Sequence, residues 1–233
     1  MIFSSDCARR DYERFYPHYK SKNFVYSFCT VIDNKNTIKS LEFLQEKYGL
    51  EEKFFYLPNQ FWVHKNHMVV FKALDILKKR GHKIKVVCTG SSHEHRSSRH
   101  YEDLMSFIRD KGLDDVKNLG LLPRDHQYSL YYYAHAVIQP SLFEGWSSIV
   151  EDARAFSKVI VLSDIPVHRE QNPPGAVYFN PHDEEELAEK LLAVWESDLP
   201  RTSDYEELVA RQNKHVQAIA RNLLRVFETC KTM

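Results

Sequence analysis

The chain lacks the features that mark several large classes of protein. It has no apolar run near the roughly 18–20 residues of a membrane span, and its apolar N-terminal stretch is too short for a secretion signal. Its four cysteines, Cys7, Cys29, Cys88 and Cys230, form no CxxC pair, a pattern typical of reduced thiols and not of a disulfide or zinc framework. We therefore expect a cytoplasmic protein.

A surplus of charge of either sign is absent as well. Lysine and arginine together number 32, and so do aspartate and glutamate. Without a basic surplus there is no electrostatic basis for binding nucleic acid or an anionic membrane. The 233 residues, of which 43% are hydrophobic, suffice for one large domain with a real core.

Short motifs of several enzyme classes are missing too. The patterns GxGxxG, GxxxxGK[ST], GxSxG and HExxH do not occur. Interpretation as a dehydrogenase, a P-loop nucleotidase, an α/β-hydrolase or a zincin therefore has no support.

What the sequence does contain, from about residue 50 onward, is an alternation of short strand-like runs and helical patterns. Alternation at this spacing predicts an α/β fold, with a parallel sheet flanked by helices and right-handed crossovers. The predicted strands are 53–57, 83–89, 116–122, 136–139, 159–163 and 176–180, and the predicted helices are 37–48, 64–81, 100–111, 125–133, 147–156 and 183–197.

Two flanking segments stand apart from this alternation. A helix from Asp6 to about Tyr16, with Asp6 as its N-cap, and a strand at 23–32 precede it. One long helix at 205–229 follows it. The first helix mixes basic and aromatic residues; its spacing favours an ordinary packed helix, with peripheral contact to a membrane surface as the alternative.

The stretch from Pro140 to Asp152, PSLFEGWSSIVED, carries the most information about function. A predicted strand ends in a loop with Glu144 and Gly145, and a helix with Glu151 in its first turns follows. Ligands of open α/β sheets bind where strands end in this way, and the N–H groups of a helix start favour an anion such as phosphate. Neighbouring carboxylates can accept hydrogen bonds from sugar hydroxyls, so the combination suggests a nucleotide sugar.

This stretch resembles the paired-glutamate signature of GT-B glycosyltransferases of family 4, in their C-terminal, Rossmann-like, nucleotide-sugar-binding half. The signature usually has seven residues between its glutamates; here six separate Glu144 from Glu151, a spacing known as a recurring subtype. The loop at 57–67 is also similar, with Lys65 on the family's lysine and Gln60 on its arginine, both directed at the diphosphate. The loop at 163–170 is a third similarity.

The resemblance implies a role for each residue. Glu151 would bind the ribose hydroxyls, Glu144 would contact the donor sugar and stabilise charge at its anomeric carbon, and Lys65 would stabilise the leaving diphosphate. The other implied donor-binding residues are Gln60, Gly90, Leu122, Arg124, Gly145, Ser147 and Ser148.

Each of the three main residues also has a purely structural interpretation. Glu151 could be an acid that interacts with the helix dipole, Glu144 a solvated loop acid, and Lys65 an exposed lysine at a helix start. His64 and His67 have a spacing that could hold a metal, but no third ligand follows nearby, so no metal is expected.

The resemblance implies a retaining, metal-independent transfer of a hexosyl group from a nucleotide-diphosphate sugar to a sugar or lipid-linked acceptor, without a cofactor. The implied context is polysaccharide assembly at the cytoplasmic membrane face. Two alternatives remain open: a non-catalytic nucleotide-sugar-binding subunit, and a sugar-nucleotide epimerase, whose catalytic acids the sequence does not locate.

A GT-B enzyme has two Rossmann-like domains, and this chain is too short to hold the N-terminal, acceptor-binding one. We expect residues 1–36 to be the end of that domain, 37–200 the donor domain, and 201–233 a helix that crosses back. The chain would then be a fragment or one subunit of a split enzyme, and its incomplete interdomain surface would require a partner.

Overall fold

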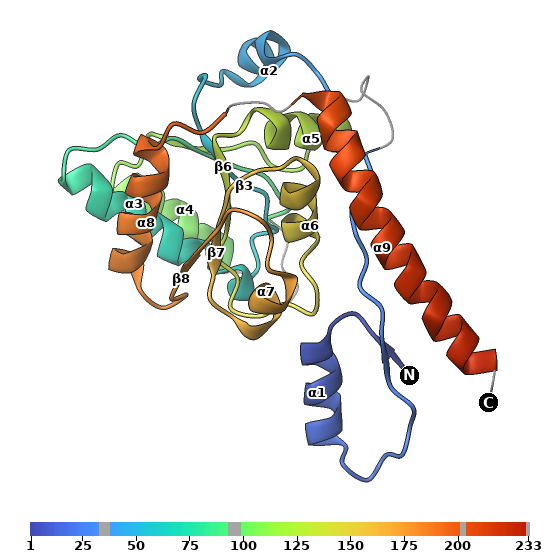
Figure 1. The fold of residues 1–233 in the computed structure, drawn as a ribbon. Coiled ribbons are helices and arrows are strands. Elements are labelled where there is room, and N and C mark those ends of the chain that lie inside the picture. The colour runs from blue at the N-terminus through green and yellow to red at the C-terminus, as the bar shows by residue number, and fades with distance from the viewer. Residues whose placement is uncertain (33–37, 93–98, 201–203, 232–233) are drawn as a thin grey trace.

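In the computed structural model, six parallel strands form one central sheet in the order β5-β4-β3-β6-β7-β8 (Figure 1). The structure describes residues 1–32, 38–92, 99–200 and 204–231. The predicted α/β fold with a parallel sheet is confirmed. The strands of the sheet are β3 (Phe55–Leu57), β4 (Val86–Cys88), β5 (Val116–Asn118), β6 (Ala136–Gln139), β7 (Ile160–Ser163) and β8 (Ala176–Phe179).

Helices cover both faces of the sheet (Figure 1). Successive side chains of each strand point to opposite faces, so Tyr56 packs into one core and Phe55 and Leu57 into the other. One face carries α3 (His67–Lys79), α4 (His100–Asp110) and α8 (Glu184–Glu196). The other carries α2 (Leu41–Tyr48), α5 (Arg124–Tyr133), α6 (Ser148–Ala155) and the long α9 (Tyr205–Lys231).

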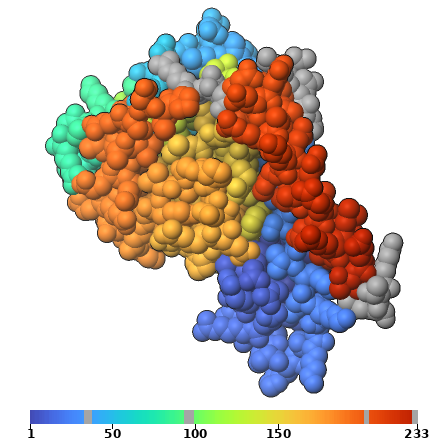
Figure 2. All heavy atoms as spheres, in the orientation of Figure 1, coloured from blue at the N-terminus to red at the C-terminus, as the bar shows by residue number. Residues whose placement is uncertain are grey.

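The N-terminal residues form a small separate unit. Strands β1 (Ile2–Phe3) and β2 (Phe24–Val25) pair in parallel, with α1 (Asp6–Phe15) between them in the chain. The unit and the far end of α9 project from the body of the molecule (Figures 1 and 2). It is anchored at α7 (Pro166–Gln171), where the Glu170 carboxylate accepts hydrogen bonds from two N–H groups at the start of α1.

Several predictions for the flanks are wrong. The strand at 23–32 shortens to β2, because β1 offers only two residues with which to pair. The N-cap of α1 is Ser5, whose side chain accepts a hydrogen bond from the N–H of Ala8 at 3.0 Å; Asp6 is the first helical residue. No residue of α1 is fully buried, but the helix packs on α7 and on the two short strands, with the ring of Tyr12 5.1 Å from that of Phe3.

Two further differences concern the body. The predicted helix at 64–81 is broken at Asn66, whose φ of 55° ends a 3₁₀ turn at Val63–Lys65 before α3 begins. Helix α7 lies where a loop was expected; it has six residues and begins with Pro166. Within the described ranges, no helix combines the length and the apolar character needed to cross a membrane.

Candidate functional site

The strand order reverses between β3 and β6, which are neighbours in the centre of the sheet. From β3 the chain builds outward through β4 to β5, and from β6 it builds the opposite way through β7 to β8. The loops that leave the carboxyl ends of β3 and β6 therefore diverge, and the space between them is the usual ligand position of open α/β sheets. Gln60 and Lys65 follow β3, and Glu144 follows β6.

Lys65 and Glu144 meet across this switch point. The Lys65 Nζ lies 2.5 Å from Oε1 of Glu144, and the two side chains are only 12% and 11% exposed. Asn66 ties the two loops together, because its Nδ2 donates to the carbonyl of Pro140 at 3.1 Å. The structure thus brings together the two residues predicted to act on the reacting bond, in a poorly solvated place where their charges act strongly.

Gln139, at the end of β6, fixes the position of Glu144. Its fully buried Nε2 donates to Oε1 of Glu144 at 3.0 Å and to Oγ of Ser147 at 2.9 Å. Its Oε1 accepts from Nδ2 of Asn59, at the end of β3, at 2.8 Å. Gln139 was not predicted from the sequence, although a glutamine at the end of an otherwise apolar strand was a signal.

His168 of α7 is buried with a fixed tautomer. Its Nδ1 lies 2.9 Å from the carbonyl oxygen of Ser163, so Nδ1 carries the proton and donates to that carbonyl. Among the described residues, no group hydrogen-bonds to the buried Nε2. Burial lowers the pKa of His168 to about 4, so the ring is neutral at pH 7 and adds no charge near Lys65.

Glu151 lies in α6 and is 1% exposed, and its carboxylate faces α7 and α9. Oε1 accepts from Nε2 of Gln171 at 3.1 Å, and Oε2 lies 3.1 Å from Nε2 of His215 in α9. Arg154 adds an ion pair at 3.5 Å. None of these three partners is a residue predicted to bind the donor, and the ribose role of Glu151 stays a prediction.

Asp152, the next residue, turns the other way. Both of its carboxylate oxygens lie within 2.8 Å of Nη2 of Arg124, and Oδ1 also accepts from Oγ1 of Thr30 at 2.6 Å. The side chain is 2% exposed, and burial raises its pKa. Asp152 was missed by the sequence analysis, although the seven residues between Glu144 and Asp152 match the usual family spacing.

Of the remaining predicted residues, two lie together after the neighbouring strands β3 and β4 and one does not. Gln60 and Gly90 come together: Oε1 of Gln60 accepts from the N–H of Ser91 at 2.6 Å, and a Cβ on Gly90 would lie 2.1 Å from the carbonyl oxygen of Asn59. Only glycine permits this close approach between the ends of β3 and β4. Leu122 takes no part in these contacts. Its carbonyl oxygen accepts a hydrogen bond from Nε2 of Gln127.

The helix start is less open to a ligand than expected. The N–H of Ser147 already donates to Oε1 of Gln171 at 3.1 Å. Ser148 is exposed, and Gly145 is half-buried beside Ser4 of the N-terminal unit. The indole N–H of Trp146 donates to the carbonyl of Phe28 at 2.9 Å, so residues of the N-terminal segment lie directly against this loop.

No group of three or more His, Cys, Asp or Glu side chains in the described ranges is placed to hold a metal ion. His64 and His67 do not form such a group. His67 packs instead on the ring of Phe61, with ring centroids 4.5 Å apart.

Comparison of the sequence with known proteins identifies the family of this chain. The model of the family "Glycosyl transferases group 1" matches residues 46–215. The O-antigen chain mannosyltransferase RfbU of Salmonella typhimurium is 24% identical over 186 residues, which are 78% of this chain and 46% of RfbU. The chain thus spans about half the length of this curated relative.

Solved structures share the fold at low identity. A glycosyltransferase from Rickettsia africae matches with a TM-score of 0.74 and 16% identity, over 98% of this chain and 62% of its own. Sucrose-phosphate synthase from Thermosynechococcus elongatus matches with a TM-score of 0.70 and 17% identity, over 99% and 58%. These matches show the fold alone. From the family match over most of its length, we conclude that the chain belongs to the group 1 glycosyltransferases.

Proposed function

We propose that the chain is the donor-binding half of a retaining hexosyltransferase that uses a nucleotide-diphosphate sugar. The observation that carries this proposal is the Lys65–Glu144 pair, 2.5 Å apart and poorly solvated at the switch point. When the bond from the anomeric carbon to the diphosphate breaks, negative charge develops on the departing oxygen and positive charge on the sugar. Lys65 would stabilise the first and Glu144 the second.

The scheme requires no metal or cofactor. The Lys65 ammonium supplies positive charge for the diphosphate, and the start of α6 adds the partial charge of its N–H groups. Gln139 would act as a positioning residue, since its amide holds the Glu144 carboxylate in place.

A second carboxylate would bind the ribose. Glu151 is the candidate from the sequence, but Asp152 is favoured by its contacts. Its carboxylate faces Arg124, itself a predicted donor-binding residue after β5, whereas that of Glu151 faces Gln171 and His215. We therefore propose Asp152 as the ribose-binding residue, with Glu151 as the alternative.

The biological context is proposed from the relative. RfbU is by name an O-antigen chain mannosyltransferase, so we propose mannose as the sugar to test first and a growing polysaccharide, sugar or lipid-linked, as the acceptor. With this activity, we propose that the protein lies in the cytoplasm, peripherally at the inner membrane face.

The rest of the catalytic cleft would come from an acceptor-binding domain or partner subunit. We propose that residues 1–36 end that domain, that 37–200 are the donor domain and that 201–233 cross back. Exposed apolar side chains on both flanks support a partner, among them Phe15 at the end of α1, Tyr19 after it and Phe227 on α9. The alternative function, a non-catalytic donor-binding subunit, rests on the same surfaces.

Titration of the chain with UDP, GDP, ADP and dTDP tests the proposal. We expect saturable binding of at least one of them, roughly 10- to 100-fold weaker in Lys65→Met, the effect of losing one charge-assisted hydrogen bond. Lys72→Met is the matched control, because Lys72 pairs with Glu184 on the surface. A folded chain that binds none of the four would contradict the proposal, and sugar transfer by the chain alone would exclude the non-catalytic alternative.

A further inference from the structure

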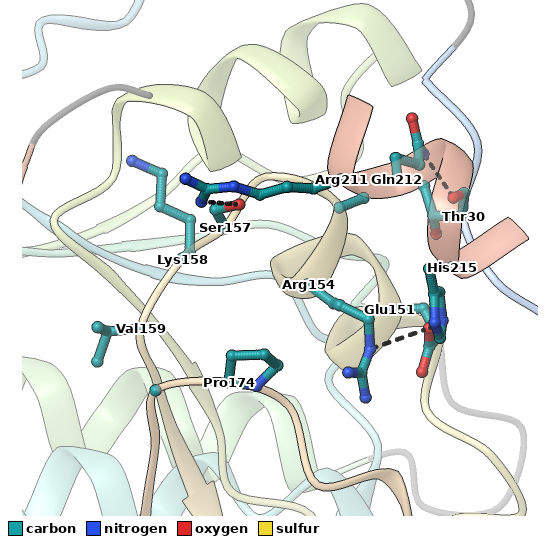
Figure 3. A pocket seen from close by; sticks show the side chains of 12 residues that line it. Thr30, Glu151, Arg154, Ser157, Lys158, Val159, Pro174, Arg211, Gln212 and His215 are labelled. Carbon is teal, nitrogen blue, oxygen red and sulfur yellow. Dashed lines mark hydrogen bonds and ion pairs between the residues drawn. The ribbon is translucent and has the colours of Figure 1, made fainter. Parts of the chain in front are cut away.

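A cavity of about 550 Å³ lies between α6 and α9 (Figure 3). Neither Lys65 nor Glu144 is among its lining residues. Part of its wall comes from Val159 and Gly175, which immediately precede β7 and β8. The cavity therefore reaches the amino edge of the sheet, whereas the candidate donor site lies at the carboxyl edge. Its volume falls within the ~300–1,000 Å³ typical of small-molecule sites.

The charges around this cavity are unbalanced. Its lining includes the cations Arg154 and Arg211, the amine of Lys158 and the imidazole of His215, but only one carboxylate, Glu151. That carboxylate already contacts Arg154 and His215, while Arg211 pairs with Glu207 outside the lining at 3.2 Å and the Nζ of Lys158 donates to the carbonyl of Ala134 at 2.9 Å. Since the chain as a whole has equal numbers of acidic and basic residues, the positive excess is a local feature, and it favours an anionic occupant.

Figure 3 shows how these groups are distributed. Arg211 approaches Ser157, and Arg154 and His215 gather around Glu151. Lys158 is 5% exposed, and burial lowers its pKa to about 7. A nearby anion would favour the protonated form of that amine.

The chemistry of the lining defines the ligand class. Two guanidinium groups favour an oxyanion such as a carboxylate or phosphate. A phosphomonoester carries about −1.5 to −2 charges at pH 7, which suits several cations better than a single carboxylate charge does. Ala155, Val159 and Pro174 supply an apolar wall for the body of the molecule.

We propose that this cavity binds a small soluble phosphomonoester, independently of the nucleotide sugar. The site goes beyond the proposed transferase function, because it shares neither Lys65 nor Glu144. Glu151 belongs to its wall, which gives that carboxylate a place outside the donor site.

The test is calorimetric titration of the full chain with phenyl phosphate, with benzyl alcohol as the neutral analogue. The key variant is Arg211→Gln, because Arg211 is exposed on α9 and contacts Glu207 and Ser157, but no residue of the candidate donor site. Arg221→Gln, on an exposed arginine further along α9 that does not line the cavity, is the matched control. Circular dichroism and the thermal midpoint verify that both variants are folded.

We expect phenyl phosphate to bind saturably and benzyl alcohol not to bind. Arg211→Gln should weaken binding roughly tenfold, the loss of one charge-assisted contact, whereas Arg221→Gln and Lys65→Met should leave it unchanged. Three results would overturn the proposal: no saturable binding, equal binding of the alcohol, or a loss in Lys65→Met without a loss in Arg211→Gln. The last result would place the phosphate in the donor site and leave the proposed function intact.

Discussion

Substitutions at the neighbouring residues Glu151 and Asp152 should have different effects on the affinity for nucleotide. If Asp152 binds the ribose, Asp152→Asn removes a charged acceptor from the two ribose hydroxyls. Hydrogen bonds to a charged group contribute about 1.5–3 kcal/mol, so binding of the nucleoside diphosphate should weaken roughly 10- to 150-fold. Glu151→Gln keeps a hydrogen-bonding side chain among Gln171 and His215 and should change the affinity little.

The decisive reagent is the 2′,3′-dideoxy form of the same nucleoside diphosphate, which lacks the ribose hydroxyls. In calorimetry, the native chain should bind the dideoxy form less tightly than the ordinary one, and Asp152→Asn should bind both with similar, low affinity. This comparison separates the ribose contact from a general loss of fold, because misfolding would weaken both ligands. Asp125→Asn serves as a control on a half-buried carboxylate in the first turn of α5, which pairs with Lys39.

A ribose role for Asp152 is excluded if Asp152→Asn still prefers the ordinary ligand and Glu151→Gln does not. That result would return the ribose role to the residue predicted from the sequence. Asp152→Asn should lower the free energy of unfolding only slightly. Arg124 is half-exposed, so water would solvate its guanidinium once the partner side chain is neutral.

Three further predictions concern stability. Gln139→Leu should lower the free energy of unfolding in urea by about 1–3 kcal/mol, because the buried amide of Asn59 and hydroxyl of Ser147 lose a partner; an unchanged midpoint would show that the network adds nothing. His168 has a folded pKa of about 4, below the ordinary value of 6.5, so the unfolded chain binds more protons between these values and stability should fall as the pH drops from 6.5 to 4. His168→Asn should reduce that slope, and an identical pH profile would contradict the assignment. Gly90→Ala should cost more than about 3 kcal/mol because its Cβ meets backbone, whereas Gly81→Ala, with φ +88° and open space around it, should cost about 1–2 kcal/mol; equal costs would refute the close-approach argument.

The body of the fold could be predicted from periodicity. The run at Ala136–Gln139 is mostly apolar and is followed by Pro140, and it forms a strand with those bounds. Helix α7 was missed because six residues are too few to show a helical period. The strand at 23–32 was overestimated because strand formation depends on a partner, and a single segment does not reveal the length of its partner.

The candidate site could be predicted only in part. The resemblance pointed to Lys65 and Glu144, and the structure places them in contact. Consecutive residues of a helix point about 100° apart, so sequence position alone does not tell which of Glu151 and Asp152 faces Arg124. Gln139 was missed because its importance lies in contacts with Asn59 and Ser147, which come from separate parts of the chain.

The most direct test of the central claim is a crystal structure of the chain with the nucleoside diphosphate that binds most tightly. The account predicts the diphosphate at the switch point between β3 and β6, with a phosphate oxygen within hydrogen-bonding distance of the Lys65 Nζ and the ribose hydroxyls on the Asp152 side of α6. A nucleotide bound at the amino edge of the sheet, or anywhere without contact to Lys65, would contradict it.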